Sequence, residues 1–176
     1  MTQPAESYVP IAKIRTQSYR SWAIALTVVA VWLLMIVLPP ILAASGNTGI
    51  SSPLYHFFSY ICHQMPARSF HLMDHQLTVC SRCFGVYFGL LFGIAIYPLW
   101  RSVENIDPLP RMWLFASMVP IAIDWSLGVF GIWENNHFSR FVTGLILGLG
   151  CATYIMPALV EIVRNISGGR STGLVR

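Results

Sequence analysis

Residues 21–42 have the sequence SWAIALTVVAVWLLMIVLPPIL, a run of 22 residues without a charged side chain. An α-helix rises about 1.5 Å per residue, so about 20 apolar residues are enough to cross a hydrocarbon core about 30 Å thick. The apolar part of a cleavable signal peptide is shorter, at about 7–15 residues. The run therefore predicts a transmembrane helix.

Three further apolar runs, at about residues 83–100, 112–133 and 141–163, are also long enough to cross a membrane. The whole chain of 176 residues is 55% hydrophobic and only 10% charged, whereas about a quarter of the residues of a soluble domain are charged. This composition excludes a water-soluble globular protein. We expect an all-α, four-span transmembrane helical bundle that forms a single membrane domain at residues 21–163, with tails at 1–20 and 164–176.

The positions of lysine and arginine predict how the chain is oriented. Cytoplasmic loops of membrane proteins carry an excess of these residues. Eight of the eleven lie on one side of the expected helices: Lys13, Arg15, Arg20, Arg101, Arg111, Arg164, Arg170 and Arg176. We therefore expect both termini in the cytoplasm of a multipass protein of the cell (inner) membrane. The net charge of +4 then reflects orientation, so the predicted partner is the lipid bilayer and not a nucleic acid.

The long loop at residues 43–82 should lie outside the cytoplasm. Its apolar stretch at residues 53–62 is too short to span the membrane and predicts a short interfacial helix. Glycines recur at four-residue spacing in the second and fourth expected spans, at Gly85, Gly89 and Gly93 and at Gly144 and Gly148. This spacing lets helix backbones approach closely in lipid. We expect packing faces there, through which the chain could also form a homo-oligomer.

Three of the four cysteines cluster in this outer loop, at Cys62, Cys80 and Cys83. Three thiolates and one imidazole suit tetrahedral zinc, and the Cys-x-x-Cys spacing is typical of structural zinc sites. His63 follows Cys62 directly, and it could bind the same ion only if the backbone turns sharply. His71 and His75 are alternative fourth ligands, which would share one face of a helix at positions i and i+4.

The sequence around the cysteines resembles a family of small bacterial multipass membrane proteins of unknown function. Its signature is Cys-His-Gln, then Arg-Ser, then Cys-x-Arg-Cys-x-Gly-x-Tyr-x-Gly, which this chain matches at residues 62–64, 68–69 and 80–89. The resemblance extends to Asp124-Trp125, Ser139-Arg140 and Thr143-Gly144. It implies no reaction, but it favours His63 as the fourth ligand.

Asp124 lies inside the third expected span. A carboxylate in the bilayer costs about 2.5–3.5 kcal/mol and needs a partner or a proton. Arg82 and Arg140 should lie at the same depth. One hypothesis is a buried ion pair that fixes the helices. The other is a polar pocket beneath the cysteines, with Asp124, Arg82 and Arg140 as candidate catalytic residues; Asp124 would accept a proton or bind a cation, and the arginines would hold an anion.

Two functions fit these residues. The first is a metal-binding membrane protein, with zinc as the expected cofactor, whose pocket is either structural or that of a metal-dependent membrane enzyme. The second is a quinone-linked thiol-disulfide oxidoreductase that uses the Cys80-Cys83 pair, since the compartment outside the cytoplasm is oxidising. The chain resembles the quinone-linked membrane thiol oxidases only loosely, because Arg82 lies between the cysteines and the other outer loop lacks a second cysteine pair.

Overall fold

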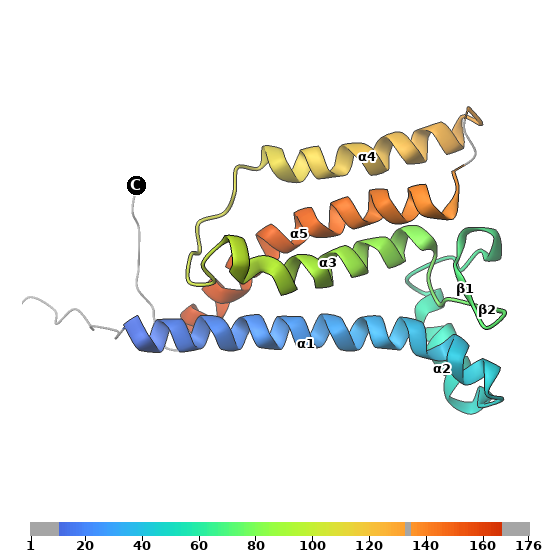
Figure 1. Cartoon of the computed structure of the whole chain (residues 1–176), viewed down its shortest axis with the longest axis horizontal. Coiled ribbons are helices and arrows are strands. Elements are labelled where there is room, and N and C mark those ends of the chain that lie inside the picture. Colours follow the sequence, from blue (N-terminus) through green and yellow to red (C-terminus); the bar gives the residue numbers. More distant parts are fainter. Residues whose placement is uncertain (1–10, 133–134, 167–176) are drawn as a thin grey trace, which may run out of the picture.

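The computed structural model of the chain describes residues 11–132 and 135–166 (Figure 1). In chain order, its elements are α1 (Ile11–Ala44), α2 (Thr48–Ser59), the short 3-10 helix η1 (Pro66–Arg68), β1 (His71–Leu72), β2 (His75–Gln76), α3 (Ser81–Trp100), α4 (Met112–Val129) and α5 (His137–Ile166). Four of the helices, α1, α3, α4 and α5, are long and apolar enough to cross a membrane. The predicted fold class is therefore confirmed. Parts of the two expected tails, residues 1–10 and 167–176, lie outside the described residues.

Helices α1, α3 and α5 pack against one another, and α4 packs chiefly on α5 (Figure 1). One apolar core lies between α1, α3 and α5 and includes Ile94, Tyr97 and Met156. A second core lies where α2 and the segment before α3 meet α1, and it includes Ile36, Phe58 and Val79. The second core places the cysteine segment directly on the end of the bundle.

The two glycine rows pack against each other inside the chain. A Cβ atom at Gly89 of α3 would overlap the carbonyl oxygen of Leu145, and one at Gly148 of α5 would overlap that of Val86. These rows therefore form the contact between α3 and α5, where the backbones approach more closely than side chains would allow. The prediction of a homo-oligomer through these faces is corrected accordingly, because each row already has its partner within the same chain.

Hydrogen bonds to main-chain carbonyls in the last turns of α1 hold the following part of the chain on this helix. Pro40 has no N–H group, so the carbonyl of Ile36, four residues earlier, lacks its helical donor. The buried hydroxyl of Thr78 donates to this carbonyl at 3.1 Å, and the hydroxyl of Ser51 donates to the Pro39 carbonyl at 2.9 Å. Both bonds are buried, where water cannot replace them. They therefore hold α2 and the segment between β2 and α3 on α1.

Residues 71–76 form an antiparallel hairpin, in which His71 pairs with Gln76 and Leu72 pairs with His75. Met73 and Asp74 form its two-residue turn, with φ values of 52° and 63°, and this left-handed backbone matches the twist of a short hairpin. The prediction that His71 and His75 share one face of a helix is therefore wrong, because the chain reverses direction between them.

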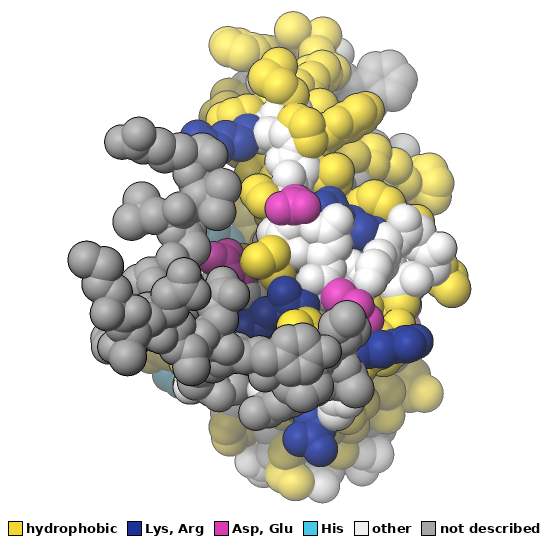
Figure 2. All heavy atoms as spheres, turned by 90° about the vertical axis from the view of Figure 1, so that its left-hand side faces the viewer, with side chains coloured by type: hydrophobic (Ala, Val, Ile, Leu, Met, Phe, Trp, Pro, Cys, Tyr) yellow, Lys and Arg dark blue, Asp and Glu magenta, His cyan; other side chains and the backbone are white. Residues whose placement is uncertain are grey.

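Charged side chains gather at the end of the bundle where α1 begins and α5 ends, which faces the viewer in Figure 2. Arg15 pairs with Glu104 at 3.7 Å. Arg164 of α5 donates to the Ser18 hydroxyl at 3.0 Å and to the Glu104 carbonyl at 2.7 Å. These contacts join α1, α5 and the loop after α3 at the end opposite the cysteines.

Candidate metal centre

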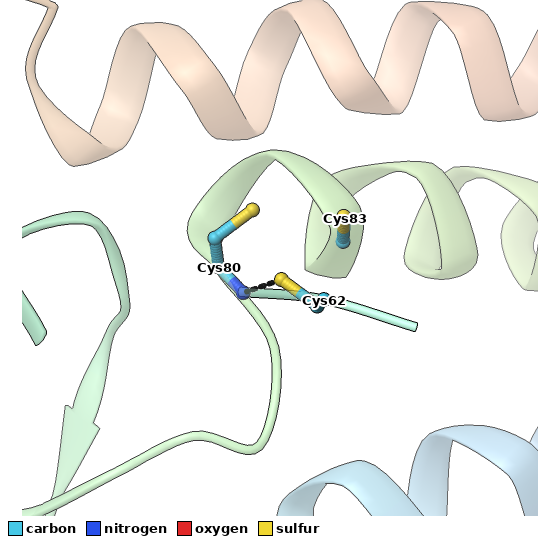
Figure 3. A group of neighbouring side chains, drawn as sticks. All are labelled: Cys62, Cys80 and Cys83. Carbon is cyan, nitrogen blue, oxygen red and sulfur yellow. Dashed lines mark hydrogen bonds between the residues drawn. The ribbon is translucent and has the colours of Figure 1, made fainter. Parts of the chain in front are cut away.

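Cys62, Cys80 and Cys83 meet at the end of the bundle (Figure 3). Cys62 lies just after α2, Cys80 is the N-cap residue of α3, and Cys83 lies in the first turn of that helix. Their three sulfur atoms lie within 4.8 Å of one another. All three cysteines are free thiols, so the group could hold a metal ion.

Main-chain N–H groups point at the sulfur of Cys62. The Cys80 N–H donates to this sulfur at 3.2 Å (Figure 3), and the main chain of Gln64 also bonds to it. Gln64 has a positive φ of 48°, so the chain turns in the left-handed region directly after this contact. Hydrogen bonds with the thiols of Cys80 and Cys83 lower the pKa of Cys62. The surroundings therefore favour a thiolate, the form of cysteine that binds metals.

The group lies between a buried wall and an open pocket. Cys62 is only 7% exposed and packs on Phe58 and Val79. On its other side is a cavity of about 340 Å³. Its lining consists of Ile61, Cys62, His63, Gln64, Met65, Arg68, Cys80, Arg82 and Cys83. A metal ion bound by the three sulfurs would therefore border this cavity.

The histidines lie apart from the three sulfurs. His63 is exposed and lines the same cavity, but its ring nitrogens do not belong to the close group found among the described residues. His71 and His75 lie on the hairpin and line neither the cavity nor the group. Of the predicted ligands, the structure thus brings the three cysteines together, and of the three predicted histidines only His63 lines the cavity beside them.

Arg82 and Asp124 form an ion pair between α3 and α4. The Nη2 atom of Arg82 donates to the Asp124 carboxylate, and the two side chains are 22% and 9% exposed. The side chain of Asn135 donates to the main-chain carbonyl of Asp124. Arg140, at the start of α5, lies close enough to interact with the charges of both Arg82 and Asp124. The structure therefore brings the three candidate catalytic residues near one another, but of these only Arg82 lines the cysteine cavity, and Asp124 lines a separate pocket together with Asn135 and Thr143.

Arg68, Ser81 and His137 also belong to this region, although the sequence did not single them out as site residues. The Ser81 hydroxyl lies 3.0 Å from the Arg68 carbonyl, to which it donates, and 2.9 Å from Nδ1 of His137. The His137 ring packs on Phe70 at 5.6 Å. Ser81 thus links η1, α3 and α5. The Arg-Ser element of the signature was the one signal for Arg68, whereas no spacing rule connects Ser81 with a residue so distant in sequence.

Residues 62–154 match the model of a family described as Predicted membrane protein (DUF2085). The chain belongs to this family. It is 38% identical over 139 residues to the uncharacterized protein MJ1492 of Methanocaldococcus jannaschii, covering 76% of this chain and 88% of that protein. It is 37% identical over 109 residues to an uncharacterized protein of Methanothermobacter thermautotrophicus, covering 62% of this chain and 96% of that protein. No solved structure matches.

The DUF2085 match begins at Cys62 and ends at Tyr154. It therefore includes the three cysteines and the ion pair of Arg82 and Asp124, whereas α1 and α2 lie before it. Membership establishes a predicted membrane protein whose three clustered cysteines could bind a metal. It carries no reaction, so function has to be argued from the site.

Proposed function

We propose that this membrane protein holds a zinc ion on Cys62, Cys80 and Cys83. The observation that carries the proposal is the mutual approach of the three sulfur atoms within 4.8 Å. In a tetrahedral zinc site with Zn–S bonds of about 2.3 Å, two sulfur ligands lie about 3.8 Å apart. Hydrogen bonds from main-chain N–H groups to a cysteine sulfur also stabilise the thiolate that such a site requires.

His63 is the proposed fourth ligand. It follows Cys62 in the chain and lines the same cavity, and its exposed side chain is free to change its rotamer. A site closed by four protein ligands is structural, whereas a site with an open fourth position can act on a substrate. The site would therefore be structural if His63 binds the metal, and could be catalytic if the fourth position is open.

Metal analysis tests the proposal. Wild-type protein purified in detergent under conditions that keep thiols reduced should contain about one zinc ion per chain, as expected for a site with three or four protein ligands. The variant Cys83→Ser should lose nearly all of this zinc, because it removes one thiolate. The matched control is Cys151→Ser, since Cys151 lies in α5 away from the group and its loss should leave the zinc content unchanged. Elemental mass spectrometry measures all three proteins.

The same experiment distinguishes the alternatives. His63→Ala should retain zinc, but a lower concentration of a competing chelator should be enough to remove the zinc from this variant than from the wild type. Wild-type protein without stoichiometric metal would contradict the proposal. If Cys80 and Cys83 then cycled between thiol and disulfide in a quinone-dependent manner, detected by a thiol-alkylating mass tag, the thiol oxidoreductase would replace it.

The metal centre lies outside the cytoplasm in this proposal, and both termini lie inside. The support is the distribution of arginine, since Arg15, Arg101, Arg111 and Arg164 belong to the end opposite the cysteines. A fluorescent protein fused after Arg176 should be fluorescent in bacterial cells. Alkaline phosphatase at the same position should be inactive, because it folds only outside the cytoplasm. The reverse pattern would contradict this orientation.

A further inference from the structure

The cavity beside the cysteines is bordered by arginine and not by acids. Arg68 and Arg82 line it, and no carboxylate belongs to its described lining. Arg140 interacts with the charges of both arginines. The carboxylate of Asp124 is 9% exposed and is already paired with Arg82. Among the residues that the structure describes here, three neighbouring positive side chains thus have one carboxylate with them, which is unfavourable unless a further negative charge binds there.

A bound metal leaves this excess in place. A divalent ion on three thiolates carries one negative charge in total, because each thiolate contributes one. Together with Asp124, this offsets two of the three charges of Arg68, Arg82 and Arg140. Among these described groups one positive charge remains, so an anion is the ligand that the cavity favours and a cation is disfavoured.

Hydrogen-bond donors are also in excess at this place. The Nε atom of Arg82 is buried and has no acceptor among the described residues, and an unsatisfied buried donor is costly. The cavity also borders the N-terminal turn of α3, which has no side-chain cap. The first N–H groups of a helix lack helical acceptors and attract anions. The guanidinium groups and the helix end therefore offer donors to a ligand with several oxygen atoms.

We infer that this cavity, walled by the three cysteines and by Arg68 and Arg82, binds a phosphate monoester or free phosphate. The inference rests on the proposed metal centre, since the cysteines form part of the wall. Guanidinium groups bind phosphate oxygens in pairs, and a phosphate has enough oxygens to accept from two arginines at once. The volume of about 340 Å³ accommodates a phosphate group. Such a group could come from solution or from a lipid headgroup.

Arg68 provides the sharpest test of this inference. Its side chain is exposed, and none of the described carboxylates lies within ion-pair distance of it. It supports the fold through its main-chain carbonyl, which accepts from Ser81, so Arg68→Gln removes the charge without removing this bond. The loss of one charged hydrogen-bonding group should weaken phosphate binding about tenfold or more. Arg68→Lys, which keeps the charge but not the paired donors, should weaken it less.

The experiment is a phosphorus-31 NMR titration of the metal-loaded protein in micelles of a phosphate-free neutral detergent. One arm uses inorganic phosphate and the other uses short-chain phosphatidate, whose headgroup is a phosphate monoester. Short-chain phosphatidylcholine, a diester with a positive choline group, is the comparison ligand and should not compete. Arg111→Gln, an exposed arginine at the far end of the bundle, is the matched control and should bind as the wild type does.

Saturable binding that depends on Arg68 in either arm supports the inference, and the arm in which it occurs identifies the source of the phosphate. Absence of binding in both arms would overturn it, as would equal binding by Arg68→Gln and the wild type. Zinc is measured in the same samples. Zinc without Arg68-dependent binding refutes the phosphate site alone, whereas a lack of zinc in the wild type refutes the proposed metal centre.

Discussion

Gly148→Leu should prevent α5 from docking on α3, so that little of the protein is recovered in folded form. Even a Cβ atom at this position would overlap the carbonyl oxygen of Val86, which belongs to a helix backbone and cannot move aside as a side chain can. Overpacking a core typically costs about 1–3 kcal/mol. A clash between two helix backbones should exceed this range and approach the whole stability of a domain, about 5–15 kcal/mol.

Size-exclusion chromatography and thermal unfolding in detergent measure this effect. The matched control is Gly49→Leu in α2, where a Cβ atom would meet nothing closer than 4.0 Å. This variant should elute and melt as the wild type does. If Gly148→Leu also behaved as the wild type does, the packing of the glycine rows described above would be contradicted.

Asp124→Leu should destabilise the protein by about 3–5 kcal/mol, the usual effect of removing one partner of a buried ion pair. Arg82 would keep its charge in a largely buried position, where its side chain is 22% exposed. The double variant Arg82→Leu/Asp124→Leu should regain most of this loss, because no unpaired charge remains. Chemical or thermal unfolding of the single and double variants measures the coupling between the two residues.

The exposed pair of Arg15 and Glu104 is the control for this cycle. The two side chains are 70% and 34% exposed, and Nε of Arg15 lies 3.7 Å from Oε1 of Glu104. Arg15→Leu should therefore lower the free energy of unfolding by no more than about 1 kcal/mol. A double variant at Arg82 and Asp124 that is as unstable as Asp124→Leu alone would show that the carboxylate acts through contacts other than this pair.

The helices could be predicted from sequence because a membrane imposes a simple condition of length and polarity. Residues 21–42 and the other apolar runs meet it, and each lies largely within a long helix. The start of α1 at Ile11 was not predicted, because a helix can continue outside the bilayer, where polar side chains are allowed. Composition marks the part of a helix within lipid and not its end.

The cysteine group could also be predicted, since the Cys80-x-x-Cys83 spacing and a third cysteine in the same outer loop are typical of a shared metal site. The hairpin at residues 71–76 could not be predicted, because Met73 is not a typical turn residue. Its left-handed backbone depends on the strands around it. Glycine spacing likewise predicts a face for close packing but does not name the helix that it faces. The position of Arg68 depends on how η1 lies against α3, which no local pattern encodes.

The pairing of α3 with α5 also has a consequence for biosynthesis. The two helices are separated in the chain by α4, which packs chiefly on α5. While the ribosome is still producing residues 101–136, the glycine row of α3 has no partner to cover it. The central contact of the bundle therefore cannot form before α5 has been synthesised, and the glycine row of α3 has to be covered by lipid or by another protein until then.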